Sequence, residues 1–277
     1  MAIPKPLIKL CLDYTSEFIY YINREHRNYA KANLDFVFND ELSDDRKKEI
    51  IKNSYKNIIY NIYEFIENQT LTQEKLKSKI LIENEYVIKE ALFNKRKIIL
   101  VTAHYGNWEY GSSIIPLKYG STTMVGRPPN NKYLHKEIDK TRTKNNTQML
   151  GKKNATRGLV KALKENRIVG LVTDQNNKNG IEIEFLDHMV KQVDTAARLA
   201  FKFDALIIPI FFTRESFGKH ILTFDKAIDS RDYTSDNKIE ELTQAQALVM
   251  TKYIKRYPDQ WLWQHRIFKE YSSDIYK

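Results

Sequence analysis

The stretch VTAHYGNWEYG, residues 101–111, places a histidine and a glutamate five positions apart around a Gly-Asn-Trp turn. A neutral imidazole can accept a proton near neutral pH, because its unperturbed pKa is about 6.5. A carboxylate that holds the second ring nitrogen fixes the tautomer and supports the imidazolium that forms. We therefore expect His104 to act as a general base and Glu109 to orient it.

No serine, cysteine or threonine stands between these two residues, so the reacting hydroxyl would come from the substrate. The backbone amides of Gly106 and Asn107, at the start of a predicted helix, are candidate donors to an oxyanion. No metal site is predicted here, because the chain has no HExxH motif and no third ligand clusters nearby. Taken alone, an H-x4-E pattern more often reflects a half-exposed histidine and a solvent-facing glutamate.

The chemistry depends on a strand that ends at the histidine. Residues 97–103, KIILVTA, form a short β-branched run that is typical of a buried strand. Alternating with predicted helices, further strands are expected at 121–125, 147–150, 167–173, 205–212 and 220–225. This alternation predicts an α/β fold with a largely parallel central sheet flanked by helices. Pro209 argues that its strand lies at an edge or contains a bulge.

Polar side chains follow four of the predicted strands. They are His104, Arg127, Asp174 and Arg214. In open α/β sheets ligands gather beyond the carboxyl ends of the strands, so these four side chains are expected to converge on one site.

The N-terminal region is predicted to be helical. Long helices are expected at 44–68, with Ser43 as N-cap, and at 73–94. We expect residues 1–24 to form an amphipathic N-terminal membrane-surface helix and residues 25–277 to form a single α/β domain. The apolar stripe of the first helix either packs on the core or lies in a membrane surface; it comprises Leu7, Cys11, Tyr14, Phe18 and Tyr21. Charges within the stripe argue against a spanning helix.

Bulk composition restricts the class of protein. With 277 residues, of which 42% are hydrophobic, the chain can bury a substantial core. The single cysteine, Cys11, cannot form an internal disulfide and is consistent with a reducing cytoplasm. The net charge of +10 suits an anionic partner such as a membrane surface, an acidic protein or nucleic acid, or it reflects general compositional bias. Because no nucleic-acid-binding signature is present, we do not expect nucleic acid as the partner.

Beyond its strand and helix pattern, the chain resembles a known family through several motifs in one order. AHYGNWE resembles the H-x4-D/E motif of the glycerolipid acyltransferase superfamily, and its GNWE form is similar to the late lipid A biosynthesis acyltransferases, the lauroyl and myristoyl transferases. Further resemblances lie in VGRP at 125–128, RGLVKALK at 157–164, LVTDQN with Asp174, and QWLWQHRIFK at 260–269. The resemblance runs from about residue 24 to residue 270.

This resemblance implies acyl transfer from acyl carrier protein to a hydroxyl of an anionic glycolipid, the Kdo-lipid A precursor, with no cofactor. By the same resemblance His104 takes the hydroxyl proton, Glu109 orients His104, Arg127 meets a phosphate or developing charge, and Asp174 supports the site wall or an arginine. The enzyme would then work at the cytoplasmic face of the inner membrane, as a peripheral or monotopic protein.

Two departures from the family pattern stand out. Family members usually begin with a more hydrophobic spanning segment, so this chain either is peripheral or starts late. The C-terminal His-Arg-Arg pattern reads His265-Arg266-Ile267, which places any phosphate contact there in doubt.

Other functions stay open on the sequence. The same chemistry could serve a phosphatidylinositol mannoside or an ornithine lipid, with acyl-CoA as donor. A non-catalytic membrane-surface binding protein with a degenerate site is the alternative from another class.

Overall fold

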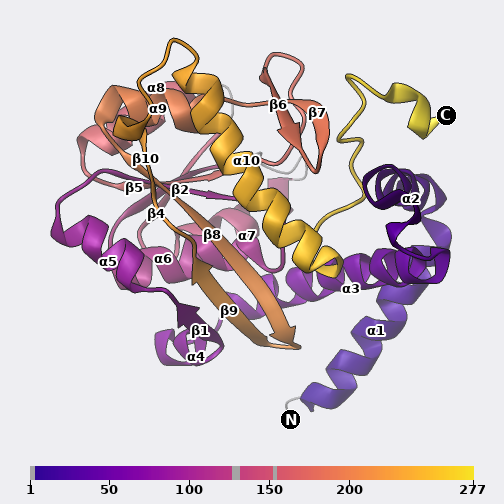
Figure 1. Ribbon diagram of the computed structural model, residues 1–277. Coiled ribbons are helices and arrows are strands. Elements are labelled where there is room, and N and C mark those ends of the chain that lie inside the picture. The colour runs from indigo at the N-terminus through magenta and orange to yellow at the C-terminus, as the bar shows by residue number, and fades with distance from the viewer. Residues whose placement is uncertain (1–3, 127–131, 152–154) are drawn as a thin grey trace.

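The protein is described by a computed structural model over residues 4–126, 132–151 and 155–277. Strands and helices alternate from β2 to β5, and the central sheet is mostly parallel, which confirms the predicted α/β class (Figure 1). The helices are α1 (Lys5–Ile22), α2 (Arg24–Phe38), α3 (Asp44–Asn68), α4 (Gln73–Ser78), α5 (Tyr86–Phe93), α6 (Gly111–Tyr119), α7 (Lys132–Thr143), α8 (Ala155–Lys164), α9 (Thr195–Phe203) and α10 (Lys238–Arg256). The strands are β1 (Ile80–Glu83), β2 (Ile98–Thr102), β3 (Thr122–Val125), β4 (Thr147–Leu150), β5 (Ile168–Val172), β6 (Ile181–Phe185), β7 (His188–Gln192), β8 (Leu206–Ser216), β9 (Lys219–Phe224) and β10 (Ile228–Asp229).

The main sheet has the strand order β1-β9-β8-β2-β5-β3-β4, and β10 pairs with the start of β8. Strands β8, β2, β5, β3 and β4 run parallel to one another, whereas β8 and β9 are antiparallel. The carboxyl ends of β2 and β5 are therefore neighbours. This adjacency brings the residues that follow each strand to the same edge of the sheet.

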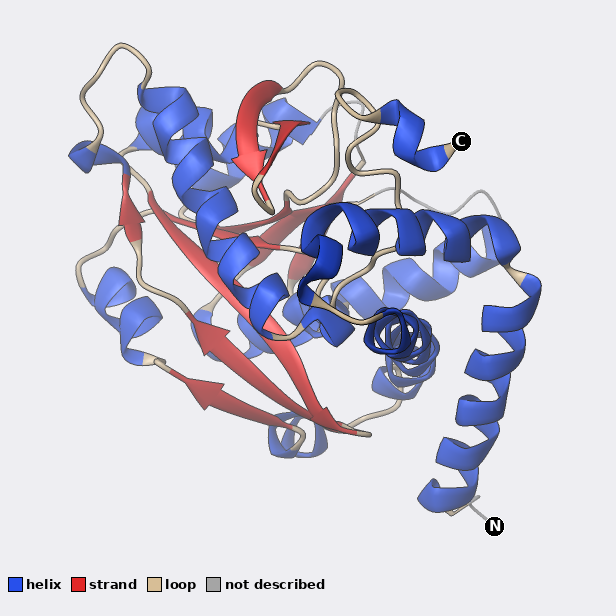
Figure 2. Cartoon of the chain, turned by 45° about the vertical axis from the view of Figure 1, so that its right-hand side comes forward, coloured by secondary structure: helices blue, strands red, loops and turns tan. Residues whose placement is uncertain are grey.

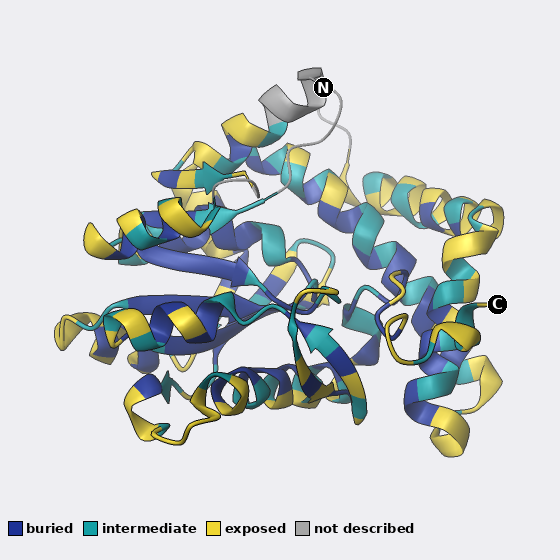
Figure 3. Cartoon of the chain, turned by 90° about the horizontal axis from the view of Figure 1, so that it is seen from above, coloured by how far each residue is buried: buried dark blue, intermediate teal, exposed yellow. Residues whose placement is uncertain are grey.

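Helices cover both faces of this sheet, and the core lies in two apolar clusters between the layers. Alternate residues of β2 belong to different clusters: Ile99 and Val101 pack with residues of α8 and α9, while Ile98 and Leu100 pack with residues of α5 and α6. A strand buried on both faces has this pattern, which is why its sequence is apolar throughout. Figure 3 shows the buried strands between helices whose outer faces are exposed.

The N-terminal helix projects from the body of the molecule, beside α2 and α3 (Figures 1 and 2). Its apolar stripe faces outward rather than into the core: Leu7, Tyr14, Phe18 and Tyr21 are 50%, 67%, 64% and 55% exposed. Within the residues that the model describes, no helix is both long and apolar enough to cross a membrane.

Two local predictions were wrong because of tertiary contacts, and one hairpin was missed. Residues 73–94 are not one helix, since Ile80–Glu83 forms β1 and pairs in parallel with β9. The hairpin of β6 and β7 was not predicted. Pro209 lies in a central strand, not at an edge. It stands between the residues of β8 that pair with β10 and those that pair with β9, where a missing N–H is tolerated.

Candidate active site

The histidine predicted as the base lies in a tight loop directly after β2. Gly106 in this loop has φ +52°, and a Cβ there would lie 1.7 Å from the carbonyl oxygen of Phe212. Only glycine fits this close approach of two backbones. On the other side, the C-terminal segment pairs with the loop: the Gly106 N–H donates to Gln260 O (2.8 Å), and the Leu262 N–H donates to His104 O (3.1 Å). Backbone bonds from two directions thus fix the position of His104.

The His104 ring is held by Asp174, the second residue beyond β5. Nδ1 of His104 lies 2.8 Å from Asp174 Oδ1, and the His104 backbone N–H donates to Asp174 Oδ2 at 2.8 Å. The Trp261 indole donates to the same Oδ2 at 2.7 Å. Burial alone would raise the pKa of Asp174, but the interactions with His104 and the indole bond lower it overall. Asp174 is therefore an ionised, almost fully buried acceptor for the imidazole.

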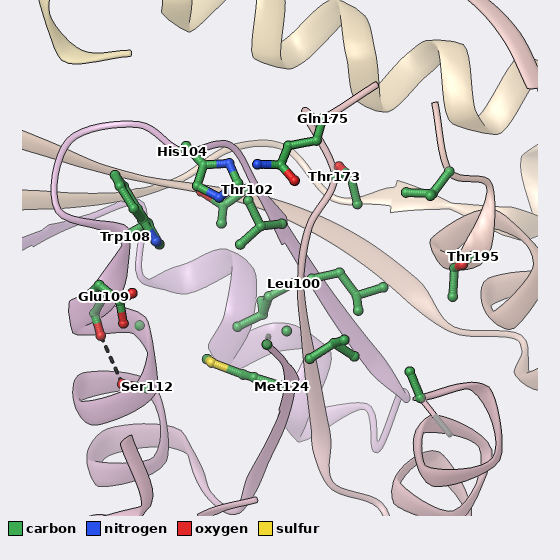
Figure 4. A pocket seen from close by; sticks show the side chains of 18 of the residues that line it. Leu100, Thr102, His104, Trp108, Glu109, Ser112, Met124, Thr173, Gln175 and Thr195 are labelled. Carbon is green, nitrogen blue, oxygen red and sulfur yellow. Dashed lines mark hydrogen bonds between the residues drawn. The ribbon is translucent and has the colours of Figure 1, made fainter. Parts of the chain in front are cut away.

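The carboxylate of Glu109 has a different partner from the one predicted. Arg142 of α7 donates to both of its oxygens, from Nε at 3.0 Å and from Nη2 at 2.6 Å. The expectation that Glu109 holds Nδ1 of His104 was wrong, because Asp174 occupies that nitrogen. Glu109 instead lies below His104 on the same side of the pocket, with Trp108 between them (Figure 4).

Two aromatic rings flank His104. The Trp108 ring meets it edge-on with centroids 5.0 Å apart, and the His265 ring lies at 6.1 Å. Burial lowers the pKa of His265, and the nearby His104 lowers it further. The neutral form of His265 is therefore favoured beside the candidate base.

A pocket of about 780 Å³ opens at His104 and Glu109 (Figure 4). It extends over the carboxyl edge of the sheet onto both faces. On the α6 face, beyond Thr102, Glu109 and Ser112, it has an apolar part that is lined by Leu100, Gly170, Met124, Ile210 and Phe212. On the α8 and α9 face polar groups predominate, among them Thr156, Thr173, Gln175, Asn176, Asn177 and Thr195. The arrangement can hold a long apolar chain with its reacting end beside an imidazole.

The predicted oxyanion donors, the amides of Gly106 and Asn107, are not available to a substrate. The first donates to Gln260 O and the second donates to Phe212 O at 3.0 Å. The Asn107 side chain is buried as well and donates to Glu64 Oε2 at 2.6 Å. The tight packing that requires glycine at position 106 also pairs the backbone N–H groups of Gly106 and Asn107 with carbonyl oxygens of the protein. These two residues therefore shape the loop and do not bind substrate.

Arg214 also lies away from the pocket. Strand β8 continues to Ser216, four residues beyond the predicted end, so Arg214 is inside the strand. Its guanidinium is buried and donates to Asn57 Oδ1 (2.8 Å), Glu64 Oε1 (2.6 Å) and Asn61 Oδ1 (2.6 Å) of α3. Asn61 in turn donates to Gly106 O at 2.7 Å. The role of Arg214 as a substrate contact was therefore wrong; it ties α3 to the loop that carries His104.

Of the four side chains expected at the strand ends, the structure brings two together, His104 and Asp174. Asp174 touches the imidazole and not the open pocket, so it does not bind substrate directly. Arg127 lies outside the described residues. Among those that are described, no group of His, Cys, Asp and Glu side chains is arranged to hold a metal ion.

Sequence reasoning missed three side chains at the site. Arg142 lies on a predicted helix with no motif to single it out. Trp261 and His265 belong to the QWLWQHR segment, which carries part of the family resemblance but gave neither side chain a role beside His104. The only available signal was the recurrence of aromatic and basic residues in this segment, which does not specify a partner.

The family model for bacterial lipid A biosynthesis acyltransferases matches residues 1–270. The chain belongs to this family. It is an acyltransferase that acts in lipid A synthesis, as the sequence resemblance predicted.

Two curated relatives are distant in sequence. The chain is 23% identical over 253 residues to the lipid A biosynthesis palmitoleoyltransferase of Escherichia coli (strain K12), covering 89% of this chain and 79% of that protein. The lipid A biosynthesis acyltransferase of Shigella flexneri matches to the same extent. Among solved structures, the 1-acyl-sn-glycerophosphate acyltransferase of Thermotoga maritima matches with a TM-score of 0.40 and 15% identity, over 90% of this chain and 98% of that one.

Proposed function

We propose that this lipid A acyltransferase moves a fatty acyl chain from acyl-[acyl-carrier-protein] to a hydroxyl of a Kdo-lipid A precursor, with His104 as general base. The observation that supports this most directly is the buried Asp174 carboxylate on Nδ1 of a histidine that lines a large, partly apolar pocket. Asp174, not Glu109, then orients the base.

The proposed reaction follows from this pair. Nε2 of His104 accepts the proton of the acceptor hydroxyl as its oxygen attacks the thioester carbonyl. The Asp174 carboxylate stabilises the imidazolium that forms. Collapse of the tetrahedral intermediate breaks the carbon–sulfur bond, and His104 returns the proton to the departing thiolate. The products are the new ester and the free thiol of the carrier.

The oxyanion of the intermediate requires a donor other than the loop amides. Gln175 directly follows Asp174 and lines the same pocket, so we assign its side-chain amide to this role. Removal of one oxyanion donor typically costs a factor of about 10²–10³ in rate. Arg142, fixed by Glu109, supplies a positive charge on the pocket wall that suits a phosphate of the acceptor.

The donor and acceptor are proposed from charge and chemistry. Acyl carrier protein is acidic and the lipid A precursor carries phosphates, and a chain of net charge +10 attracts both. The names of the two relatives, a palmitoleoyltransferase and an acyltransferase of lipid A biosynthesis, support a fatty acyl donor.

The outward stripe of α1 is the proposed contact with the cytoplasmic face of the inner membrane. Exposed apolar side chains at positions 7, 14, 18 and 21, flanked by Lys5 and Arg24, suit an anionic lipid surface. Tyr14→Glu with Phe18→Glu should reduce sedimentation with vesicles containing anionic lipid. Unchanged sedimentation would exclude α1 as the contact.

The decisive experiment is a transfer assay with acyl-loaded carrier protein and Kdo-lipid A precursor, with products weighed by mass spectrometry. The unsubstituted protein should add one acyl chain, and His104→Ala should remove this activity while the thermal unfolding temperature stays close to that of the parent. Exposed His26→Ala is the matched control and should transfer normally. Full activity of His104→Ala would exclude the proposed base.

Parallel reactions with acyl-CoA, and with phosphatidylinositol mannoside or ornithine lipid, test the choice of donor and acceptor. Transfer to phosphatidylinositol mannoside or ornithine lipid, and not to the lipid A precursor, would keep the proposed chemistry and change the acceptor. Transfer from acyl-CoA and not from the loaded carrier protein would change the donor.

A further inference from the structure

The apolar part of the pocket ends at a defined row of residues across the sheet. Leu100 of β2 is in register with Gly170 of β5, and Met124 of β3 is in register with the same glycine. All three line the pocket, whereas the next row inward, with Ile98 and Ile168, does not. At about 3.3 Å per residue, Leu100 lies at most about 13 Å from position 104, which stands in the loop after β2.

Glycine in the middle of this row leaves a notch that Met124 fills. A Cβ on Gly170 would lie 3.0 Å from both Cγ and Cε of Met124, so the methionine side chain lies directly over the glycine. Cε of the same methionine would be 3.6 Å from a Cβ on Gly111, at the start of α6. The thioether therefore spans from the sheet toward α6 and closes the apolar part of the pocket.

We propose that Met124 determines the length of the acyl chain that this enzyme transfers, by closing the floor of the pocket over Gly170. This rests on the proposed function, since it assumes that an acyl chain enters beneath His104. Methionine suits the role because its unbranched side chain packs well against a small neighbour and an apolar chain end. An acyl chain that is one methylene too short leaves apolar surface unburied, which costs about a factor of four in affinity. An acyl chain that is too long clashes with the thioether of Met124.

The test compares acyl carrier protein loaded with saturated chains of graded length. Met124→Ala removes three heavy atoms from the floor, so the preferred chain should lengthen by about two carbons, with about a tenfold gain for the longer donor relative to the parent optimum. Gly170→Ala should act in the opposite direction, because its Cβ raises the floor. The combined variant should return toward the parental preference, because the two changes act on one contact.

Met189→Ala is the matched control, because Met189 is 45% exposed in β7 and lies away from the pocket. Its chain-length profile should equal that of the parent. Competition of graded fatty acids against a fluorescent fatty acid gives a second readout that needs no transfer. A protein that transfers no acyl group but whose fatty-acid preference shifts with Met124→Ala would refute the proposed function, while Met124 would still be the floor of a pocket for fatty chains. Unchanged profiles in both Met124→Ala and Gly170→Ala would refute the inference itself.

Discussion

Asp174 Oδ1 lies 2.8 Å from Nδ1 of His104, although the two residues are seventy positions apart in the chain. The register of two parallel strands produces this contact. Thr102 of β2 pairs with Val172 of β5, and the Thr173 N–H donates to Thr102 O at 3.0 Å. His104 and Asp174, each two positions beyond this pair, therefore meet at the carboxyl edge of the sheet.

Replacing Asp174 by Asn should lower kcat by a factor of about 10²–10⁴, because a neutral amide cannot stabilise the imidazolium and can select the wrong tautomer. Steady-state kinetics of acyl transfer measure this. Asp187→Asn, in an exposed turn, is the control and should match the parent. A loss of less than threefold in Asp174→Asn would mean that Asp174 is not the orienting group.

Glu109 and Arg142 should behave as one unit. Because the guanidinium donates to both carboxylate oxygens, Glu109→Ala and Arg142→Ala should each destabilise the protein, and the double variant should cost less than their sum by about 0.5–3 kcal/mol. Urea unfolding of the four proteins gives this coupling energy. Should Glu109→Ala still lower kcat strongly in an Arg142→Ala background, the carboxylate would act on the reaction directly.

Gly106→Ala should be severely destabilising, by about 3 kcal/mol or more, since the new Cβ meets the Phe212 carbonyl and the backbone has positive φ. Gly151→Ala is the control, because a Cβ at that glycine has no neighbour within 4 Å. Thermal unfolding compares the two. Equal unfolding temperatures would show that the loop relaxes readily around residue 106.

Stability should fall in acid because of Glu64. Burial would raise the pKa of this carboxyl, but the hydrogen bond with His220 and the charge of Arg214 lower it to about 2. The unfolded chain binds a proton at higher pH than the folded protein does. The stabilisation is therefore complete above about pH 4.5 and is lost as pH falls toward 2, on the order of 3 kcal/mol in total.

Urea unfolding from about pH 5 to pH 3 should show this slope, and Glu64→Gln should flatten it even though the variant is less stable at every pH. Glu90→Gln, at an exposed position of α5, is the control. His220 adds a separate loss at higher pH. Its pKa is lowered, chiefly by burial, so protonation destabilises the fold as pH falls below its ordinary value of 6.5. An unaltered slope below pH 4.5 in Glu64→Gln would exclude Glu64 as the source.

Local pattern was sufficient where neighbours in sequence decide the structure. The helix at 44–68 begins after Ser43, whose hydroxyl accepts from the Arg46 N–H, as predicted. Strand β2 was predicted from an apolar run because both of its faces are buried. The local pattern failed where pairing with a distant segment decides the structure. Strand β1 forms beside β9, and β8 tolerates Pro209 inside the sheet because its pairing with β10 ends before that residue and its pairing with β9 begins after it.

The sequence alone determined the α/β class, the family, and a histidine at the end of a buried strand, because periodicity and motif order are local properties of the chain. Only the tertiary structure decided which carboxylate serves that histidine. Glu109 is near in sequence but is held by Arg142, while Asp174 is distant in sequence and reaches Nδ1 because β2 and β5 are adjacent in the sheet. Strand order is a property of the whole packed core, and no stretch of residues encodes it by itself.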